Sequence, residues 1–184
     1  MKLFGIPVVQ AKSEGEAQAA YIVEKGEAWA IKSNDYDTLL FGGKRLIYNF
    51  NPTKRNSFNP NTKISYISLI KILEELDITR EQLVEMSILI GNDYCSGIKG
   101  IGQKTALKLI KKYNSLSNLL REELEIRGKK IEINKSLIEQ VKDLFLRPNV
   151  SEKYAELIWS KAKYKKIETF MKDRDFSENR IKTP

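Results

Sequence analysis

Histidine is absent from the 184-residue chain, and cysteine occurs once, as Cys95. Catalysis by an imidazole is therefore excluded. Any metal site would have to be built from oxygen ligands, which suit Mg²⁺ or Mn²⁺ better than Zn²⁺. A single cysteine cannot form an internal disulfide, which is typical of proteins from reducing compartments.

Long hydrophobic runs are also missing. No apolar stretch approaches the roughly 18 residues that cross a membrane. The opening MKLFGIPVV has one lysine and a very short apolar run, too weak a pattern for a secretory signal. We therefore expect an intracellular protein without membrane association, cytoplasmic in a prokaryote or nuclear in a eukaryote.

Negative charge is in the minority, with 24 Asp and Glu against 32 Lys and Arg, for a net charge of +8. This balance favours a polyanionic partner such as nucleic acid. A lysine-rich composition is also found in heat-adapted proteins, so the charge alone leaves both explanations open. The acids that are present gather in pairs, and carboxylates gathered inside a basic protein indicate a divalent metal.

The first 50 residues alternate between strand and helix patterns. We expect buried strands at 6–10, 28–33 and 46–50. A helix should run from a Ser13 cap, with Glu16 three residues on as in a capping box, to Gly26. The Pro- and Asn-rich stretch 51–63 should form an exposed excursion. This order predicts an α/β fold with a short, mainly parallel sheet.

From about Ser65 onward the pattern becomes helical, and Thr79 is a candidate helix cap. Helices are expected at 67–77, 78–91, 103–113, 115–123, 134–146, 151–162 and 164–172. The chain then divides into residues 1–64, a half-sheet with acids, residues 65–176, a helical region, and a tail at 177–184. All of these parts would form one compact domain.

Five acids are expected at one edge of the sheet. Glu14 and Glu16 open the first helix, Asp35 and Asp37 follow the next strand, and Asp93 follows an apolar helix. Sites in open α/β sheets form at the carboxyl ends of strands, so these side chains should converge.

Each acid also has an ordinary explanation. The glutamates suit a helix N-terminus, the paired aspartates suit a turn, and Asp93 could cap the next segment. Convergence would bring like charges together, and their repulsion must be offset by cations. Two divalent ions roughly 3.5–4 Å apart would do so and would clamp a phosphodiester for attack by water.

The segment GIKGIGQKTALKLIKKY contains two tight turns that lead into a helix. The first N–H groups of such a helix can hold a phosphate, and lysines surround them. The candidate DNA-binding residues are Lys99, Gly100, Gly102, Gln103, Lys104, Thr105 and Lys108. The alternative is a hairpin used only for packing, with solvated lysines. Backbone contacts of this kind would recognise duplex shape rather than sequence.

Three segments, GIPVVQAKSEGEAQAAYI, SNDYDTLLFG and ILIGNDYCSGIKGIGQKTALKLI, resemble the archaeal and eukaryotic flap endonucleases in order and spacing. The resemblance runs from residue 4 to about 176. It implies the internal and C-terminal half of a PIN-like 5′ nuclease fold, with a helix-two-turn-helix at about 92–113.

The resemblance also implies the site and its reaction. It makes Glu14, Glu16, Asp35, Asp37 and Asp93 catalytic ligands of two Mg²⁺ ions, for which Mn²⁺ can substitute. It implies a K⁺ ion on backbone carbonyls at Gly97, Ile98 and Ile101. The implied activity is hydrolysis of a 5′ flap near a single-strand/duplex junction in DNA replication and repair, with related 5′–3′ exonuclease action.

The sequence departs from the family pattern at both ends. The N-terminal region of the family, with two further aspartates and a helical arch bearing a catalytic Lys and Arg, has no counterpart here. The clamp-binding tail motif is missing too. We therefore expect a separately encoded N-terminal nuclease chain as a partner, and no sliding clamp. The alternatives are a duplex-DNA-binding module without cleavage, and a remnant whose acids only cap helices.

Three aromatic residues are given simple expectations. Trp29 and Trp159 should lie in the core. Tyr36 should pack as an ordinary aromatic, and the alternative is that its ring stacks on a nucleobase.

Overall fold

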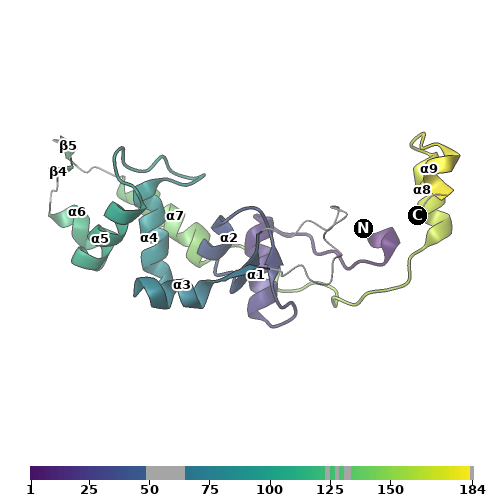
Figure 1. The fold of residues 1–184 in the computed structure, drawn as a ribbon, viewed down its shortest axis with the longest axis horizontal. Coiled ribbons are helices and arrows are strands. Elements are labelled where there is room, and N and C mark those ends of the chain that lie inside the picture. The colour runs from purple at the N-terminus through teal and green to yellow at the C-terminus, as the bar shows by residue number, and fades with distance from the viewer. Residues whose placement is uncertain (49–64, 123–124, 127–128, 131–133, 183–184) are drawn as a thin grey trace. The chain divides into compact units, whose positions relative to one another are not determined.

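The computed structural model of the chain describes residues 1–48, 65–122, 125–126, 129–130 and 134–182 (Figure 1). They form two compact units. The central unit is Lys12–Val150, and the terminal unit joins Met1–Ala11 to Ser151–Pro184. This division differs from the sequence-based one, which placed boundaries at residues 64 and 176 inside a single domain.

A three-stranded sheet lies in the central unit. Strands β1 (Ile31–Lys32) and β2 (Arg45–Ile47) are parallel, with Ile31 opposite Leu46. Strand β3 (Tyr66–Ser68) pairs with β2 in the antiparallel direction. The α/β prediction is therefore confirmed, while the parallel character holds for β1 and β2 only.

The strand predictions had mixed outcomes. The two strands expected at 28–33 and 46–50 are found as β1 and β2, although both are shorter. The strand expected at 6–10 is wrong: these residues have no strand pairing, and Val8 is 46% exposed. Strand β3 was not predicted, because its three residues precede a helix and share its apolar pattern. The excursion expected at 51–63 lies outside the described residues.

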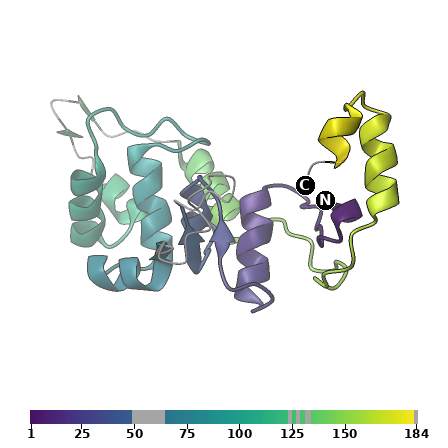
Figure 2. The same cartoon turned by 45° about the vertical axis from the view of Figure 1, so that its right-hand side comes forward.

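Helices are the main secondary structure of the central unit (Figures 1 and 2). They are α1 (Gly15–Glu24), α2 (Asp37–Leu40), α3 (Leu69–Leu76), α4 (Arg80–Ile90), α5 (Gln103–Tyr113), α6 (Leu116–Arg121) and α7 (Lys135–Leu146). A two-stranded hairpin of β4 (Glu125–Ile126) and β5 (Lys129–Lys130) lies between α6 and α7 in the sequence.

Helix caps explain where several of these helices begin. Thr79 caps α4 as predicted and forms a complete capping box with Gln82. The Ser13 cap is wrong: the cap residue of α1 is Glu14, without a side-chain cap hydrogen bond. The Ser13 hydroxyl instead donates to the Asn149 carbonyl at 3.0 Å.

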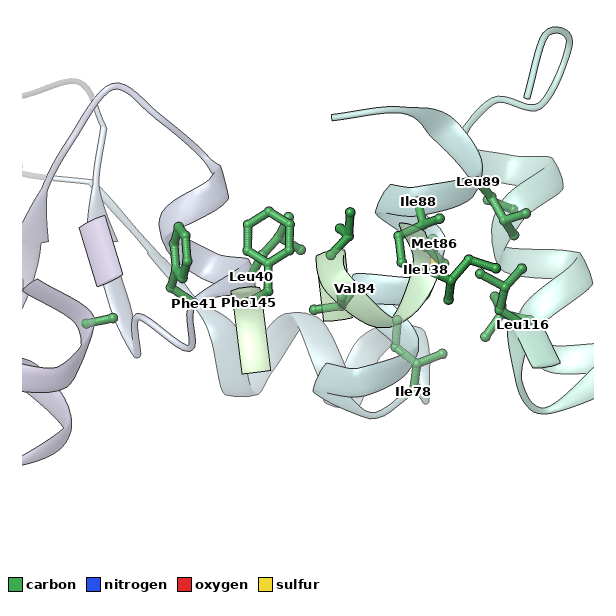
Figure 3. Packing of buried hydrophobic residues seen from close by; sticks show 14 of the residues in the cluster. Leu40, Phe41, Ile78, Val84, Met86, Ile88, Leu89, Leu116, Ile138 and Phe145 are labelled. Carbon is green, nitrogen blue, oxygen red and sulfur yellow. The ribbon is translucent and has the colours of Figure 1, made fainter. Parts of the chain in front are cut away.

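The main core of the central unit is formed by α1, α2 and α4–α7 (Figure 3). Phe145 of α7 is fully buried, and its ring centroid lies 4.8 Å from that of Phe41. Val84, Leu89 and Leu116 are also fully buried. Truncating side chains in such positions to alanine generally costs about 2–5 kcal/mol.

One charged side chain lies inside this core. Glu85 of α4 is 1% exposed. One carboxylate oxygen accepts the Leu116 N–H at 3.0 Å, which satisfies the start of α6. The other accepts Lys142 Nζ of α7 at 3.0 Å, and Lys142 also reaches Glu81 at 2.7 Å. Glu85 therefore links α4 to both α6 and α7.

The terminal unit is built from both ends of the chain. It contains the 3₁₀ helix η1 (Lys2–Phe4), α8 (Tyr164–Lys172) and α9 (Glu178–Lys182). The Ser160 N–H donates to the Gly5 carbonyl at 2.9 Å, and the Lys163 N–H donates to the Leu3 carbonyl at 2.8 Å. Gly5 has φ 74°, and a Cβ there would overlap the Ser160 carbonyl.

The predictions for this unit also had mixed outcomes. The helix expected at 164–172 is confirmed as α8. The helix expected at 151–162 is wrong, because this segment is non-helical and pairs its backbone with the first residues of the chain. The expected tail contains α9. Among the described residues, no helix has the length and apolarity needed to cross a membrane.

Candidate metal centre and nucleic-acid interface

A tightly hydrogen-bonded turn follows β1 and carries the first two aspartates. The Asp35 N–H donates to Ser33 Oγ at 3.0 Å, and the Asp37 N–H donates to Asp35 Oδ1 at 2.9 Å. The Thr38 hydroxyl donates to the Asp35 carbonyl at 2.8 Å. Short polar side chains that bond to nearby backbone are typical of such turns. The turn fixes both aspartates at the carboxyl end of β1.

A second turn places Asp93. Helix α4 ends at Ile90, and Gly91 has φ 107°, a conformation that favours glycine. Asn92 then closes the turn: its Oδ1 accepts the Tyr94 N–H at 2.9 Å, and its Nδ2 donates to Ser87 Oγ at 3.1 Å. Asp93 is held in this turn with its side chain exposed.

The two turns bring three carboxylates together. Asp35, Asp37 and Asp93 each offer an oxygen, and these oxygens lie within 4.8 Å of one another. Asp35 and Asp93 are exposed, while Asp37 is half-buried. Three carboxylate oxygens at this spacing match the ligand set that hard divalent cations such as Mg²⁺ prefer.

The electrostatics of the group are unfavourable without a cation. The pKa of Asp37 is raised to about 6, first by burial and then by the negative charges of Asp35, Asp93 and Glu16. Opposite charge close to such a carboxyl favours its ionised form. The donor chemistry and the repulsion both suit a bound divalent ion.

The two glutamates lie beside this group rather than within it. Glu16 Oε1 accepts the Ser33 hydroxyl at 3.3 Å, so it is linked to the turn that carries Asp35. Glu14 accepts a hydrogen bond from the Tyr94 hydroxyl. The pKa of Tyr94 is raised to about 12, mainly by burial and next by this hydrogen bond. The structure thus gathers three of the five predicted acids around one point and places the other two next to it.

Sequence reasoning missed the residues that hold these acids. Ser33 and Asn92 each lie one or two residues before an aspartate, a spacing that could have suggested a side-chain-capped turn. Tyr94 gave no such signal, because its partner Glu14 is 80 positions away in the sequence.

The glycine-rich turns lie directly after Asp93. Gly97 has φ 66° and Gly100 has φ 96°. A Cβ on Gly97 would overlap the backbone of Ile90 and Gly91, so only glycine allows this close approach. The Ile98 N–H donates to the Leu89 carbonyl at 2.9 Å and ties the turn to α4.

Helix α5 begins at the end of these turns. Its cap residue is Gly102, and no side chain caps the helix. The side chains of Lys99, Gln103, Lys104 and Lys108 are exposed, as are Gly100 and Gly102, and Thr105 is half-buried. The predicted DNA-binding residues therefore surround one helix N-terminus, where an anion is favoured by the helix dipole.

The predicted K⁺ ligands belong to the same turns. The Ile98 carbonyl already accepts the Ile101 N–H at 3.0 Å, and the Ile101 side chain is 5% exposed. A carbonyl oxygen can accept a second contact. The potassium site stays a prediction.

Comparison with known proteins gives two family matches. Residues 5–93 match the XPG I-region, and residues 78–175 match the 5′-3′ exonuclease C-terminal SAM fold. A flap endonuclease 1 from Methanobrevibacter smithii is 44% identical over 98% of this chain and 51% of its own length. The chain thus spans about half the length of the curated relatives it matches.

Solved structures give the same picture. Flap endonuclease-1 from Methanococcus jannaschii has a TM-score of 0.75 and 34% identity, covering 98% of this chain and 52% of its own. Human GEN1, in complex with Holliday junction DNA, has a TM-score of 0.69 and 25% identity, covering 94% of this chain and 45% of its own. With both family regions present in order, the chain belongs to the flap endonuclease family of 5′ nucleases, and it corresponds to about half the length of the curated members it matches.

Proposed function

We propose that this chain is the metal- and duplex-binding part of a structure-specific 5′ flap endonuclease. It would hydrolyse a phosphodiester near a single-strand/duplex junction during DNA replication and repair. The observation that carries this proposal is the group of Asp35, Asp37 and Asp93 within 4.8 Å, with the glycine-rich turns and α5 following directly after Asp93. The relatives named flap endonuclease 1 support the reaction.

The carboxylates of the central unit would hold the metal. Asp35, Asp37 and Asp93 supply the inner ligands, and Glu14 and Glu16 add negative charge beside them. Divalent cations bound there would neutralise the charge of the scissile phosphodiester and activate the attacking water. The hydrogen-bonded turns keep the aspartates in place, so little reorganisation is needed when substrate binds.

The start of α5 would bind the duplex. Its first N–H groups, which no side chain caps, would bind a phosphate of the duplex, and Lys99, Lys104 and Lys108 add positive charge around them. Such contacts fix the position of the duplex without reading its sequence. The junction DNA in the GEN1 structure supports this class of ligand.

An N-terminal nuclease half would complete the sheet and the site. In the described sheet, β1 is an edge strand that pairs only with β2. An unpaired strand edge is a template for another strand, and this edge carries the turn with Asp35 and Asp37. We propose that a separate N-terminal chain pairs there and adds further acids to the metal site.

The test is cleavage of a labelled double-flap DNA in Mg²⁺, first with this chain alone and then with an added N-terminal half of a family member. Activity on mixing, or with this chain alone, supports the nuclease assignment. Duplex binding without cleavage in either condition would instead favour a DNA-binding module.

Two substitutions separate chemistry from binding. Asp35→Ala removes a metal ligand, so it should slow cleavage by a factor of about 100 or more. The affinity for duplex DNA should stay nearly unchanged. Lys104→Ala should weaken duplex binding and lower its salt slope by about one unit or less. If Asp35→Ala removes binding but not cleavage, the assignment of the acids is wrong.

A further inference from the structure

Two exposed tyrosines, Tyr36 and Tyr48, pack against each other at the turn that carries Asp35 and Asp37. Tyr36 is the residue between Asp35 and Asp37, and it is 55% exposed. Its ring lies against that of Tyr48, which is 37% exposed, with centroids 6.5 Å apart and planes inclined by 33°. The expectation that Tyr36 packs as an ordinary aromatic is therefore wrong.

The backbone that carries Tyr36 is fixed. The Asp37 N–H is bonded to Asp35, the Thr38 hydroxyl is bonded to the Asp35 carbonyl, and the Leu39 N–H donates to the Tyr36 carbonyl at 2.9 Å. The backbone at Tyr36 is thus fixed by the same turn that positions the carboxylates, and the exposed ring has Tyr48 as its aromatic neighbour. Little conformational freedom remains to be lost when a ligand covers it.

The surroundings of the rings restrict what can bind. A bare phosphate would meet the charges of Asp35, Asp37 and Asp93, which repel it unless cations are present. A nucleobase is uncharged and presents a flat face, and bases stack on aromatic rings with little regard for their identity. A phosphodiester held above the carboxylates would bring its neighbouring base close to the Tyr36 ring, because Tyr36 is adjacent in sequence to two of them.

We propose that Tyr36 and Tyr48 form a stacking surface for an unpaired nucleobase next to the scissile phosphodiester. The inference rests on the proposed function and deepens it: the substrate would be recognised by its unpaired nucleotide as well as by its duplex. Tyr36 and Tyr48 act here as binding and positioning residues, and the carboxylates carry the chemistry.

The experiment measures binding of the full chain to two fluorescein-labelled duplexes in Mg²⁺, one blunt and one with a single-stranded extension. Tyr36→Ala and Tyr48→Ala should weaken binding of the extended duplex by about 5- to 100-fold. Binding of the blunt duplex should change less than about 2-fold. The salt slope should stay constant, since stacking releases no counterions.

Matched variants separate the ring from the fold. Tyr36→Phe keeps the ring and should retain binding, while Tyr36→Leu keeps apolar bulk and should behave like Tyr36→Ala. Tyr66→Ala removes another exposed tyrosine, which packs against Trp29, and should leave both affinities unchanged. Circular dichroism checks that each variant is folded.

A base analogue reports stacking directly. 2-Aminopurine at the unpaired position should be quenched by the wild type and by Tyr36→Phe, and less by Tyr36→Ala. Equal weakening of both duplexes, or no change for the extended one, would overturn the inference while leaving the proposed function intact. If the wild type binds neither duplex, the proposed function itself fails.

Discussion

The Asp37 carboxyl is made a weaker acid by its burial and by the negative charges around it. Its pKa is about 6, against 3.8 for an ordinary aspartate, with burial as the largest cause and neighbouring acids next. Between these two pH values the folded protein holds a proton that the unfolded chain releases. The free energy of unfolding therefore falls as the pH rises from about 4 to 6 and stays lowered above it.

Asp37→Asn should remove this penalty in metal-free protein. At pH 8 in EDTA the melting temperature of the variant should lie about 2 °C above that of the wild type. For a chain of this size, this corresponds to less than about 1 kcal/mol in the free energy of unfolding. At about pH 2.5 the difference should vanish, because Asp37 is then protonated in both the folded and the unfolded state. Mg²⁺ should stabilise the wild type more than the variant.

The exposed Glu75 on α3 offers a control, since Glu75→Gln removes a charge outside the acidic group. The difference in melting temperature between Glu75→Gln and the wild type should be the same at low and at high pH, because both proteins keep Asp37. A melting temperature of Asp37→Asn at or below that of the wild type at pH 8 would contradict the prediction.

The positions of single site residues could be predicted where a residue directly follows the end of a strand or helix. Asp35, Asp37 and Asp93 could be expected to meet because each follows an element that ends at the same edge. The hydrogen bond between Tyr94 and Glu14 could not be predicted, because it depends on tertiary packing. Trp29 and Trp159 were wrongly expected in the core: they are 57% and 71% exposed.

Two ion pairs of Lys142, with Glu81 and Glu85, join α7 to α4, and the hydrogen bond from the Leu116 N–H to Glu85 joins α6 to them. Hydrophobic periodicity reveals none of these contacts. Burial alone would lower the pKa of Lys142, but hydrogen bonds to Glu81 and Glu85 outweigh it and raise that pKa. Within the apolar core, the charge on Glu85 is stabilised by Lys142 and by the N–H of Leu116.

Lys142→Met should lower the free energy of unfolding by about 3–5 kcal/mol, because it leaves the Glu85 charge buried without its cation. Urea denaturation followed by circular dichroism measures the loss. The double variant Glu85→Leu with Lys142→Met should recover part of it. Lys135→Met, on the exposed start of α7, is the control and should change stability by less than about 0.5 kcal/mol. A loss as small as that control's would mean that the ion pair contributes little.

The helices themselves were largely predictable, because apolar spacing and caps are local properties. Thr79 with Gln82 marks the start of α4, and Ser115 and Asn134 mark α6 and α7. Strand β3 was missed because three residues carry too little pattern. The segment 151–162 has a helix-like apolar pattern but is not helical. Its backbone pairs with Gly5 through Ser160, a long-range contact that a local pattern does not reveal.

The two-unit organisation predicts that Gly5 matters to the far end of the sequence. Gly5→Ala places a Cβ against the Ser160 carbonyl at a φ of 74°. Amide hydrogen exchange at Ser160 and Lys163 should accelerate by about 5-fold or more, while protection of α4 and α5 should stay unchanged.

Gly15→Ala is the matched control, since a Cβ on Gly15 would meet no atom within 4 Å. It should leave exchange at Ser160 and Lys163 unaffected. Unchanged exchange at these two amides in Gly5→Ala would show that the close approach of the two segments does not hold the terminal unit together.

The joining of both chain ends in the terminal unit has a consequence during synthesis on the ribosome. Residues 12–150 contain every strand and helix of the central unit, so that unit can fold while the C-terminal residues are still inside the exit tunnel. Leu3 and Gly5 must wait for Ser160 and Lys163 to emerge before their carbonyls are paired. Leu3 and Gly5 are thus translated long before their native partners, and a stalled or truncated product would expose them to chaperones and proteases.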